Sequence, residues 1–488
     1  MAGNIIQNLL RKNKPISREA AAKILKTRPE ALEAFEEAYV FQAFPGIPSD
    51  DLFECDSAEI RRQLKKVSRI PEADQERGAE AIIDRIVQEF LSGTQVLTYD
   101  GERLSLHTFP TDAIGPAVTK EEIMQLPEAL RPQLSGSLMK KDLSGPPAYR
   151  TLLEYWEMSR TDKNPKMRKT AYHMFRQGLD ILDLDPVMYR MLDMNPNAIG
   201  YWFPALAQAI PRDSFFQIPK TKVMKVPMPM LQLTRLDYGS LTPATLKVVD
   251  RFCHTAFELD DNKEYFVKTG TYSSKFDFRN AHVHEEKEVR ELGEYLLYIQ
   301  NQACQAAGPL SSPCIYGMST TNEWCVREYI PDRGNNPCIY KGLPLRTEYR
   351  VFVDFDTDEV LGISPYWDPD TMRQRLGHEE DAGNPHKIHD YTIFLMHEET
   401  LMRRYRDGKG KVLDAVKELI PEIDLPGQWS MDIMQDGEDF WIIDMALAVN
   451  SALKECIPAG KLKSVEENWI PDIGGGEFIG EKKRNTGD

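Results

Sequence analysis

Cysteine is scarce in this chain, and the few cysteines are scattered. Only seven occur in 488 residues, and no two of them form a Cys-x-x-Cys pair. A disulfide-stapled fold or a zinc-binding domain needs closely spaced cysteines, so neither is expected. An odd number of separated cysteines is typical of a reducing compartment, and we expect a cytoplasmic protein.

Long apolar runs and an excess of basic residues are also missing. No stretch approaches the roughly 18 apolar residues that cross a bilayer, and the first residues do not resemble a secretory leader, so no membrane role is expected. Asp and Glu number 76 against 60 Lys and Arg, which gives a net charge of −16. Because phosphate neutralisation supplies most nucleic-acid affinity, this balance argues against a general nucleic-acid binder.

What is present is the composition of an ordinary globular protein. Hydrophobic residues make up 41% and charged residues 28% of the chain. At this length we expect two to four domains, each with its own core.

The first half of the chain is predicted to be mainly helical. Residues 1–109 are expected to form a helical domain that ends in a hairpin, because Asp100-Gly101 separates two β-prone runs. Residues 110–148, rich in proline and glycine, indicate a linker or loop. Residues 149–215 are predicted to be a second helical region.

From residue 216 onward, short β-prone runs alternate with single helices. The pattern predicts an α+β domain over 216–458, followed by a C-terminal tail at 459–488. The expected strands are 223–226, 230–233, 265–268, 325–330, 347–355, 360–364, 430–434 and 440–445. The expected helices are 243–257 and 285–306, and His386 and His389 are expected in a proline-bounded loop.

Two aspartates are expected to face each other across a hairpin. The segments 429–434 and 440–445 flank a polar turn, and a turn centred on Glu438 places Asp432 opposite Asp444, with Cβ atoms roughly 5 Å apart. Like charges so close repel each other among apolar neighbours, unless a cation lies between them or one carboxylate is protonated. The pair therefore predicts a Mg²⁺ site. The alternative is two exposed edge aspartates in another register.

Residues 345–355 are predicted to form a strand with a charged face. Alternation places Arg346, Glu348 and Arg350 on one side and apolar residues on the other. Guanidinium groups match phosphate and carboxylate oxygens, so this face could bind a polyphosphate and a reacting carboxylate. An exposed ladder of Glu–Arg pairs fits the pattern equally well.

A lysine also ends an apolar strand and precedes a small polar loop. Lys268 follows the run 265–267, and the loop continues through Ser273 and Ser274 to Lys275. Backbone N–H groups and hydroxyls of such a loop could cover phosphates, with the lysines as point charges. The loop is not a Walker A motif, because Gly-x₄-Gly-Lys-Ser/Thr is absent.

The order and spacing of these pieces resemble the ATP-grasp superfamily over about residues 216–455. The resemblance implies an ATP-grasp domain in the C-terminal half that binds ATP and Mg²⁺. It implies nucleotide-binding roles for Lys225, Lys268, Ser273, Ser274, Glu328, Tyr329, Ile330 and Asp332, with the segment 328–330 as a hinge whose backbone groups read adenine. It implies catalytic roles at the transferring phosphate for Lys275, Arg346 and Arg350. The implied metal ligands are Asp432, Asp444 and Asn450, the last because Ala446 stands where the family usually has asparagine.

Within the superfamily, the segments 348–353 and 440–444 most resemble one branch. That branch holds the eukaryotic cell-division-cycle proteins that assist assembly of a translation initiation factor, and related bacterial and phage peptide-ligase-like proteins. The resemblance implies an ATP-dependent ligase that activates a carboxylate as an acylphosphate and joins it to an amine or thiol, with a peptide or protein as a possible substrate. The alternative is a non-catalytic ATP-binding assembly factor for a protein partner, which Ala446 favours. A minor alternative, an RNA ligase-like nucleotidyltransferase with Lys268 as nucleophile, lacks the Lys-x-Asp-Gly motif.

Overall fold

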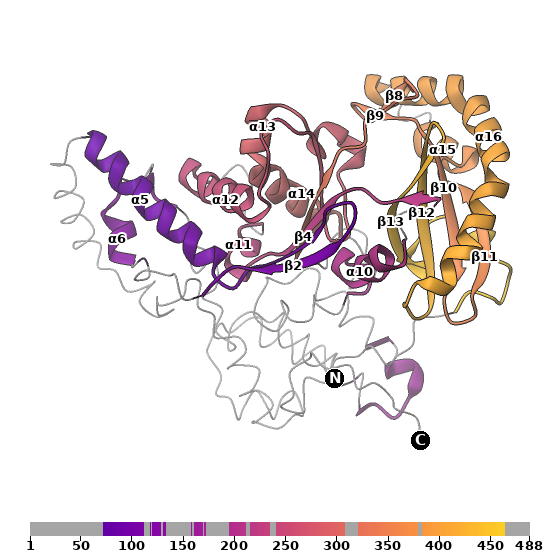
Figure 1. The fold of residues 1–488 in the computed structure, drawn as a ribbon, viewed down its shortest axis with the longest axis horizontal. Coiled ribbons are helices and arrows are strands. Elements are labelled where there is room, and N and C mark those ends of the chain that lie inside the picture. The colour runs from indigo at the N-terminus through magenta and orange to yellow at the C-terminus, as the bar shows by residue number, and fades with distance from the viewer. Residues whose placement is uncertain are drawn as a thin grey trace, which may run out of the picture.

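Two β-sheets with helices packed against them make up the part of the protein that the computed structural model describes (Figure 1). The described residues are 72–111, short pieces between 118 and 171, and 195–463 apart from gaps at 211–214, 235–240, 308–320 and 379–382. The mixture of helices and mainly antiparallel strands is an α+β fold, as the sequence predicted. The helices predicted in residues 1–71, most of those in 149–195, and most of the predicted tail lie outside the described residues.

The first sheet has six strands in the order β2-β1-β4-β7-β5-β6, and every neighbouring pair is antiparallel. Its strands are β1 (Gln95–Tyr99), β2 (Leu104–Thr108), β4 (Thr221–Lys225), β5 (Tyr265–Thr269), β6 (His282–Val283) and β7 (Glu323–Glu328). The predicted hairpin at Asp100-Gly101 is confirmed, and Gly101 has the positive φ of 102° that favours glycine. Because β1 also pairs with β4, this hairpin extends the sheet formed by later residues.

Helices cover one face of this sheet. They are α5 (Glu72–Leu91), α11 (Met228–Leu233), α12 (Pro243–Ala256), α13 (Glu286–Arg290) and α14 (Leu292–Ala307). Phe252 of α12 and Leu296 of α14 are fully buried in one core with Val267 of β5. Burying each such side chain stabilises the fold by roughly 1.5–3 kcal/mol. On the opposite face, Val223 and Cys325 pack in a second core with the helix α10 (Ile199–Ala209).

The second sheet has the order β11-β10-β12-β13-β3. Its strands are β3 (Phe216–Gln217), β10 (Thr347–Asp354), β11 (Glu359–Pro365), β12 (Gln428–Asp436) and β13 (Asp439–Leu447). All pairs are antiparallel except β13 with β3. The helices α10 (Ile199–Ala209) and α16 (Pro385–Leu419) share a core with one face of the sheet, where Tyr349, Val351 and Val353 are buried. The predicted alternation along β10 is therefore confirmed.

Smaller elements pack against α16. A short hairpin of β8 (Cys338–Ile339) and β9 (Leu343–Pro344) lies against α16, and α15 (Pro369–Leu376) packs on the same helix. Figure 1 shows α16 along the outside of the second sheet, with β8 and β9 near its upper end. No helix of the described part is long and apolar enough to span a bilayer.

Three local predictions were wrong. The strand expected at 230–233 is the end of α11, and the helix expected over 285–306 is two helices that break at Glu291. The segment predicted as a linker or loop contains a short helix, α6 (Lys120–Gln125), and the linker itself stays a prediction. His386 and His389 lie in the first turns of α16, because Pro385 occupies the first helical position and the Asn384 side chain accepts hydrogen bonds from two N–H groups.

Candidate functional site

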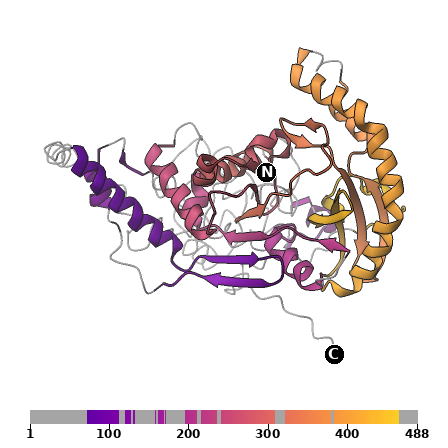
Figure 2. The ribbon, with the colours of Figure 1, turned by 45° about the horizontal axis from the view of Figure 1, so that its top comes forward.

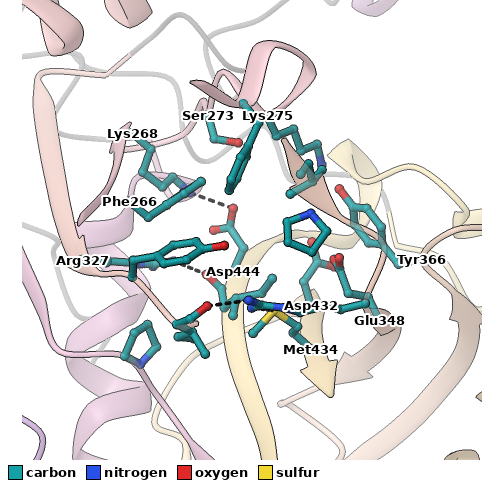
Figure 3. A pocket seen from close by; sticks show the side chains of 18 of the residues that line it. Phe266, Lys268, Ser273, Lys275, Arg327, Glu348, Tyr366, Asp432, Met434 and Asp444 are labelled. Atoms are coloured by element: carbon teal, nitrogen blue, oxygen red, sulfur yellow. Dashed lines mark hydrogen bonds and ion pairs between the residues drawn. The ribbon is translucent and has the colours of Figure 1, made fainter. Parts of the chain in front are cut away.

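A cleft lies between the two sheets, on the faces that the outer helices leave uncovered. It has a volume of about 880 Å³, counted to its open mouth. Its walls combine charged groups with apolar side chains that include Phe266, Phe278, Met434 and Ile443. In Figure 3, Lys268 and Arg327 face Asp444 and Asp432 across the cleft, with Lys275, Glu348 and Tyr366 on the far side. This mixture of apolar walls and a few convergent charges is typical of a ligand site.

The first sheet contributes two buried cations. Val267 and Val326 point into the helix-covered core, so their strand neighbours Lys268 and Arg327 point the other way, into the cleft. Lys268 is only 1% exposed, and its Nζ donates to Asp444 Oδ2 at 2.7 Å. Arg327 donates through Nη1 to the carbonyl of Ile443, while its buried Nε has no hydrogen-bond partner among the described residues.

The second sheet contributes the two aspartates, and the predicted cross-strand pair is confirmed. Asp432 of β12 lies directly opposite Asp444 of β13. The turn differs from the prediction, because Asp436 pairs with Asp439 and the register shifts by one residue between Asp432 and Ile433. That β-bulge turns Asp444 to the cleft, whereas Ile442 and Met445 remain in the opposite core.

The repulsion between the two aspartates is relieved by basic side chains of the protein. Arg350 donates to both carboxylate oxygens of Asp432, at 2.7 Å each. Burial raises the pKa of Asp444, but the Lys268 ammonium and Arg327 outweigh it and lower that pKa below the ordinary value. Among the described residues, no three His, Cys, Asp or Glu side chains gather into a group that could hold a metal ion. The predicted role of the two aspartates as ligands of Mg²⁺ therefore stays a prediction.

Glu348 and Lys275 form the far wall. Glu348 is 9% exposed and accepts a hydrogen bond from Trp367 Nε1 at 3.2 Å. Burial, reinforced by Asp432, raises the pKa of Glu348 to about 7, although Lys275 opposes the shift. Burial lowers the pKa of Lys275, whose ammonium lies 4.5 Å from the centre of the Tyr366 ring. No ion pair to Lys275 occurs in the described part of the chain.

The predicted hinge borders the cleft, but most of its N–H groups are already used. Glu328 N–H donates to the carbonyl of Lys220 and Tyr329 N–H to that of Glu264. Arg346 donates to the carbonyl of Ile330 at 2.5 Å. Among the described residues, no hydrogen bond is made by the Ile330 N–H, so this is the hinge donor left for a ligand.

The cleft brings together nine of the predicted site residues. They are Lys268, Ser273, Lys275, Glu328, Tyr329, Ile330, Arg346, Asp432 and Asp444. Arg350 reaches it indirectly, through Asp432 and the face of Tyr366. Whether any of them binds nucleotide, phosphate or metal stays a prediction.

Four predicted residues are placed elsewhere. Lys225 lies opposite Glu323, at the end of β4 away from the hinge. Ser274 is buried and donates to Gln302 at 2.8 Å, and Asp332 accepts from Asn336 and Arg346. Asn450 accepts from Asn197 outside the strands. The contacts of these residues lie within the protein rather than in the cleft. The sequence did not predict these contacts, because most of them involve residues distant in sequence.

The sequence analysis did not assign Arg327, Tyr366 and Trp367 to the site, and it gave Glu348 no separate role. Arg327 had a detectable signal, since it is a charged residue that directly follows the apolar run Trp324–Val326 on the same strand. For Tyr366 and Trp367 the sequence gave no such signal, because they follow β11 and reach the cleft only through the pairing of β11 with β10.

Comparison with known proteins does not assign this chain to a family. No protein-family model and no curated protein matches it. Solved structures that resemble it include a C-terminally truncated Cdc123 from Schizosaccharomyces pombe, with 13% identity, a TM-score of 0.32 and coverage of 53% of this chain and 86% of that one. Another structure of Cdc123 from the same organism has 13% identity, a TM-score of 0.30 and coverage of 52% and 84%. At these TM-scores the likeness carries no argument about fold or function.

Proposed function

We propose that this is an ATP-grasp protein whose cleft binds ATP, and that it acts as an ATP-binding assembly factor for a protein partner. The apolar walls and the Ile330 N–H would hold adenine, and Lys275, Arg327 and Lys268 would hold the phosphates. Asp432 and Asp444 would hold a Mg²⁺ ion together with phosphate oxygens, and the ion would neutralise phosphate charge. The motif resemblance to the ATP-grasp superfamily supports the same assignment.

The observation that carries the proposal is the balance of charges in the cleft. Lys268 and Arg350 are each matched by an aspartate, and Arg346 is matched by Asp332. Lys275 and Arg327 have no carboxylate within ion-pair distance among the described residues. Arg327 is buried and Lys275 is half-buried. Because cations removed from water need an anionic partner, these two call for a ligand with more than one negative charge. A polyphosphate has that charge.

Two features favour an assembly factor over a ligase. Ala446 lies opposite Ser430 on the hairpin that carries Asp432 and Asp444, where the resemblance implies a third metal ligand. Asn450 does not replace it, because its side chain accepts a hydrogen bond from Asn197. An incomplete set of metal ligands is compatible with nucleotide binding, and it offers less stabilisation to a transferring phosphoryl group.

One observation favours the second candidate, a carboxylate–amine ligase. The pKa of Glu348, raised to about 7 by burial, suits a general base that removes a proton from an attacking amine. In that case ADP would form only when a carboxylate and an acceptor are both present.

The test is a pair of measurements on the full chain. Millimolar Mg-ATP should raise the melting temperature of the wild type, since a ligand at 100 times its Kd adds about 2.7 kcal/mol. Arg327→Gln should weaken ATP binding about tenfold by calorimetry, because it removes a charge-assisted contact in a buried site. Lys417→Gln, an exposed change on α16, serves as the control and should bind ATP like the wild type.

The outcomes separate the candidates. A melting temperature that Mg-ATP leaves unmoved would exclude ATP binding. ATP binding without ADP production across a panel of amino acids and peptides supports the assembly factor. ADP production that depends on an acceptor and is lost in Glu348→Gln supports the ligase.

A further inference from the structure

Two cations of the cleft converge on the ring of Tyr366. In Figure 3 this side chain lies at the wall of the cleft, near Lys275 and Glu348. The Lys275 ammonium lies 4.5 Å from the centre of the ring, and the central carbon of the Arg350 guanidinium lies 4.7 Å from it. Cations within about 6 Å of a tyrosine ring are attracted by the negative charge of its face. The ring therefore interacts with both cations.

The three residues come from different parts of the fold. Lys275 follows the loop after β5 of the first sheet, whereas Arg350 lies on β10 of the second sheet and Tyr366 directly follows β11. Figure 2 shows the two sheets side by side. The ring thus belongs to the second sheet and contacts a cation that the first sheet supplies.

Arg350 has other partners besides the ring. It donates to both carboxylate oxygens of Asp432, at 2.7 Å each, and to the carbonyl of Ala452 at 3.3 Å. Loss of the ring would leave these hydrogen bonds in place. The position of the Arg350 guanidinium therefore does not depend on Tyr366 alone.

Lys275 has no comparable partner. Within the described part of the chain, its ammonium makes neither an ion pair nor a hydrogen bond. The carboxylates that face it at longer range are those of Asp432, Glu348 and Asp444. Burial lowers the pKa of Lys275, and the charge of Arg350 adds to this effect. The Phe276 ring lies 5.6 Å from the ammonium, so Tyr366 is the closer of the two rings that favour its charged form.

The ring itself is held in place by its neighbours. The backbone N–H of Tyr366 donates to the carbonyl of Glu348 at 2.9 Å, next to the last pair of β10 with β11. The ring packs edge-on against Trp367, with ring centres 5.2 Å apart, and Trp367 is only 2% exposed. A lysine has a flexible four-carbon stem, so a fixed neighbour is needed to keep its ammonium in one place. Tyr366 is such a neighbour for Lys275.

We propose that Tyr366 is a positioning residue of the cleft, whose ring keeps the Lys275 ammonium charged and directed at an anionic ligand. The inference rests on the proposed function in one respect, because the phosphates of ATP are the ligand that Lys275 would then contact. Tyr366 acts through Lys275 rather than by touching the ligand. Leucine at this position is apolar but lacks the negative ring face, whereas phenylalanine keeps that face.

The first test compares variants of the full chain with and without the ring. Tyr366→Leu should weaken Mg-ATP binding by roughly threefold to tenfold, measured by calorimetry, because the contact between the ring and Lys275 is lost. Tyr366→Phe should bind within about twofold of the wild type. Tyr366→Met is a second ring-free variant, and the melting temperature without ligand shows which variants are folded.

The matched control is Tyr391→Leu. It makes the same change at a partly buried tyrosine of α16 that does not line the cleft. Tyr391→Leu should bind Mg-ATP within about twofold of the wild type.

A double-mutant cycle tests whether Tyr366 acts through Lys275. When Tyr366→Leu is added to Lys275→Gln, the further loss of affinity should shrink to within about twofold, because the ring no longer has an ammonium to hold. An undiminished loss would show that the ring contacts the ligand itself or acts on another residue. That result would overturn the positioning role.

The charge on Lys275 is measured without nucleotide. Only the neutral amine reacts with acetic anhydride, so labelling of Lys275 is followed by peptide mass spectrometry relative to the exposed Lys417. At pH 7 the normalised rate should be roughly twofold to fivefold higher in Tyr366→Leu than in the wild type, since the ammonium loses the ring. At pH 10 the difference should be smaller, because more of the amine is neutral in both proteins. An equal increase at both pH values would show a change in access alone and overturn the inference.

The outcomes separate this inference from the proposed function. If the wild type does not bind ATP but the labelling differs as expected, the proposed function fails and the role of Tyr366 toward Lys275 stands. If ATP binds but Tyr366→Leu matches the wild type in affinity or in labelling, the inference fails alone. A loss in Tyr366→Phe or in Tyr391→Leu as large as that in Tyr366→Leu would also overturn it.

Discussion

Lys268 and Asp444 form a contact that neither side chain could make without the other sheet. The lysine is 1% exposed on β5, and the aspartate lies on β13, 176 residues later. A buried ammonium without a partner is unfavourable, so Asp444 stabilises the fold in addition to any role in ligand binding. The same holds for Arg350, whose charge is compensated by both oxygens of Asp432.

This pairing predicts the stability of Asp444→Asn. From the aspartate pair alone, removing one of two like charges would leave the protein as stable or slightly more stable. Because Lys268 would lose its carboxylate, we instead expect Asp444→Asn to lower the free energy of unfolding by roughly 1–3 kcal/mol, measured by urea denaturation. Asp439→Asn on the same strand, which loses a more exposed ion pair to Arg333, should cost about 0.5 kcal/mol. Equal midpoints for Asp444→Asn and wild type would contradict this account.

At the scale of elements, the bulge in the β12–β13 hairpin decides which side chains reach the cleft. Regular alternation after Ile442 would place residue 444 in the α16-covered core. The extra residue, Ile443, moves Asp444 to the cleft. The polar turn and the flanking apolar runs predicted the hairpin, because they are local. They did not predict the bulge, which depends on the packing of both faces.

Another element-scale feature is the close contact between α12 and α14. A Cβ atom added at Gly293 would lie 2.6 Å from the carbonyl oxygen of Val249, which belongs to the backbone and cannot move aside. We expect Gly293→Ala to destabilise the protein by about 1–3 kcal/mol, measured by thermal and urea unfolding. The control is Gly78→Ala on α5, where nothing lies within 4 Å, and this change should be neutral or stabilise by up to about 1 kcal/mol. Similar effects of the two changes would show that the contact between α12 and α14 is looser than a separation of 2.6 Å implies.

At the scale of the whole molecule, the two sheets bury a carboxyl group between them. The pKa of Glu348 is raised by burial to about 7, above the ordinary value of 4.5. The folded state therefore binds a proton more tightly than the unfolded state, and this contribution to stability falls as the pH rises from about 4.5 to about 7.

Glu348→Gln removes that dependence. The measured quantity is the free energy of unfolding of Glu348→Gln minus that of the wild type. We expect this difference to be more positive at pH 8 than at pH 4.5, by roughly 2 kcal/mol. The measurement is urea unfolding of both proteins across this pH range, without nucleotide. A constant difference between them at all pH values would show that Glu348 does not titrate in this window. Glu359→Gln, an exposed glutamate on β11, gives the reference for an ordinary carboxyl group.

The sequence by itself determined the features that depend on neighbours along the chain. It predicted the hairpins at Asp100-Gly101 and at Asp432–Asp444, the alternation along β10 and the helix at α12, because turn residues, capping and periodicity act over a few residues. It also placed Lys268, Arg346 and Lys275 among the residues of interest, the first two as charged side chains on predicted strands and Lys275 as the end of a small polar loop.

Only the tertiary structure decided which of these residues meet. Arg327, Tyr366 and Trp367 reach the cleft because β7 pairs with β4 and β5, and β11 with β10, and these pairings join segments far apart in sequence. Lys225 and Asn450 were misplaced for the same reason, because their surroundings come from other elements. The repulsion predicted between Asp432 and Asp444 is relieved by Lys268 and Arg350, and such compensation becomes visible only when both sheets are in place, since charges interact through space rather than along the chain.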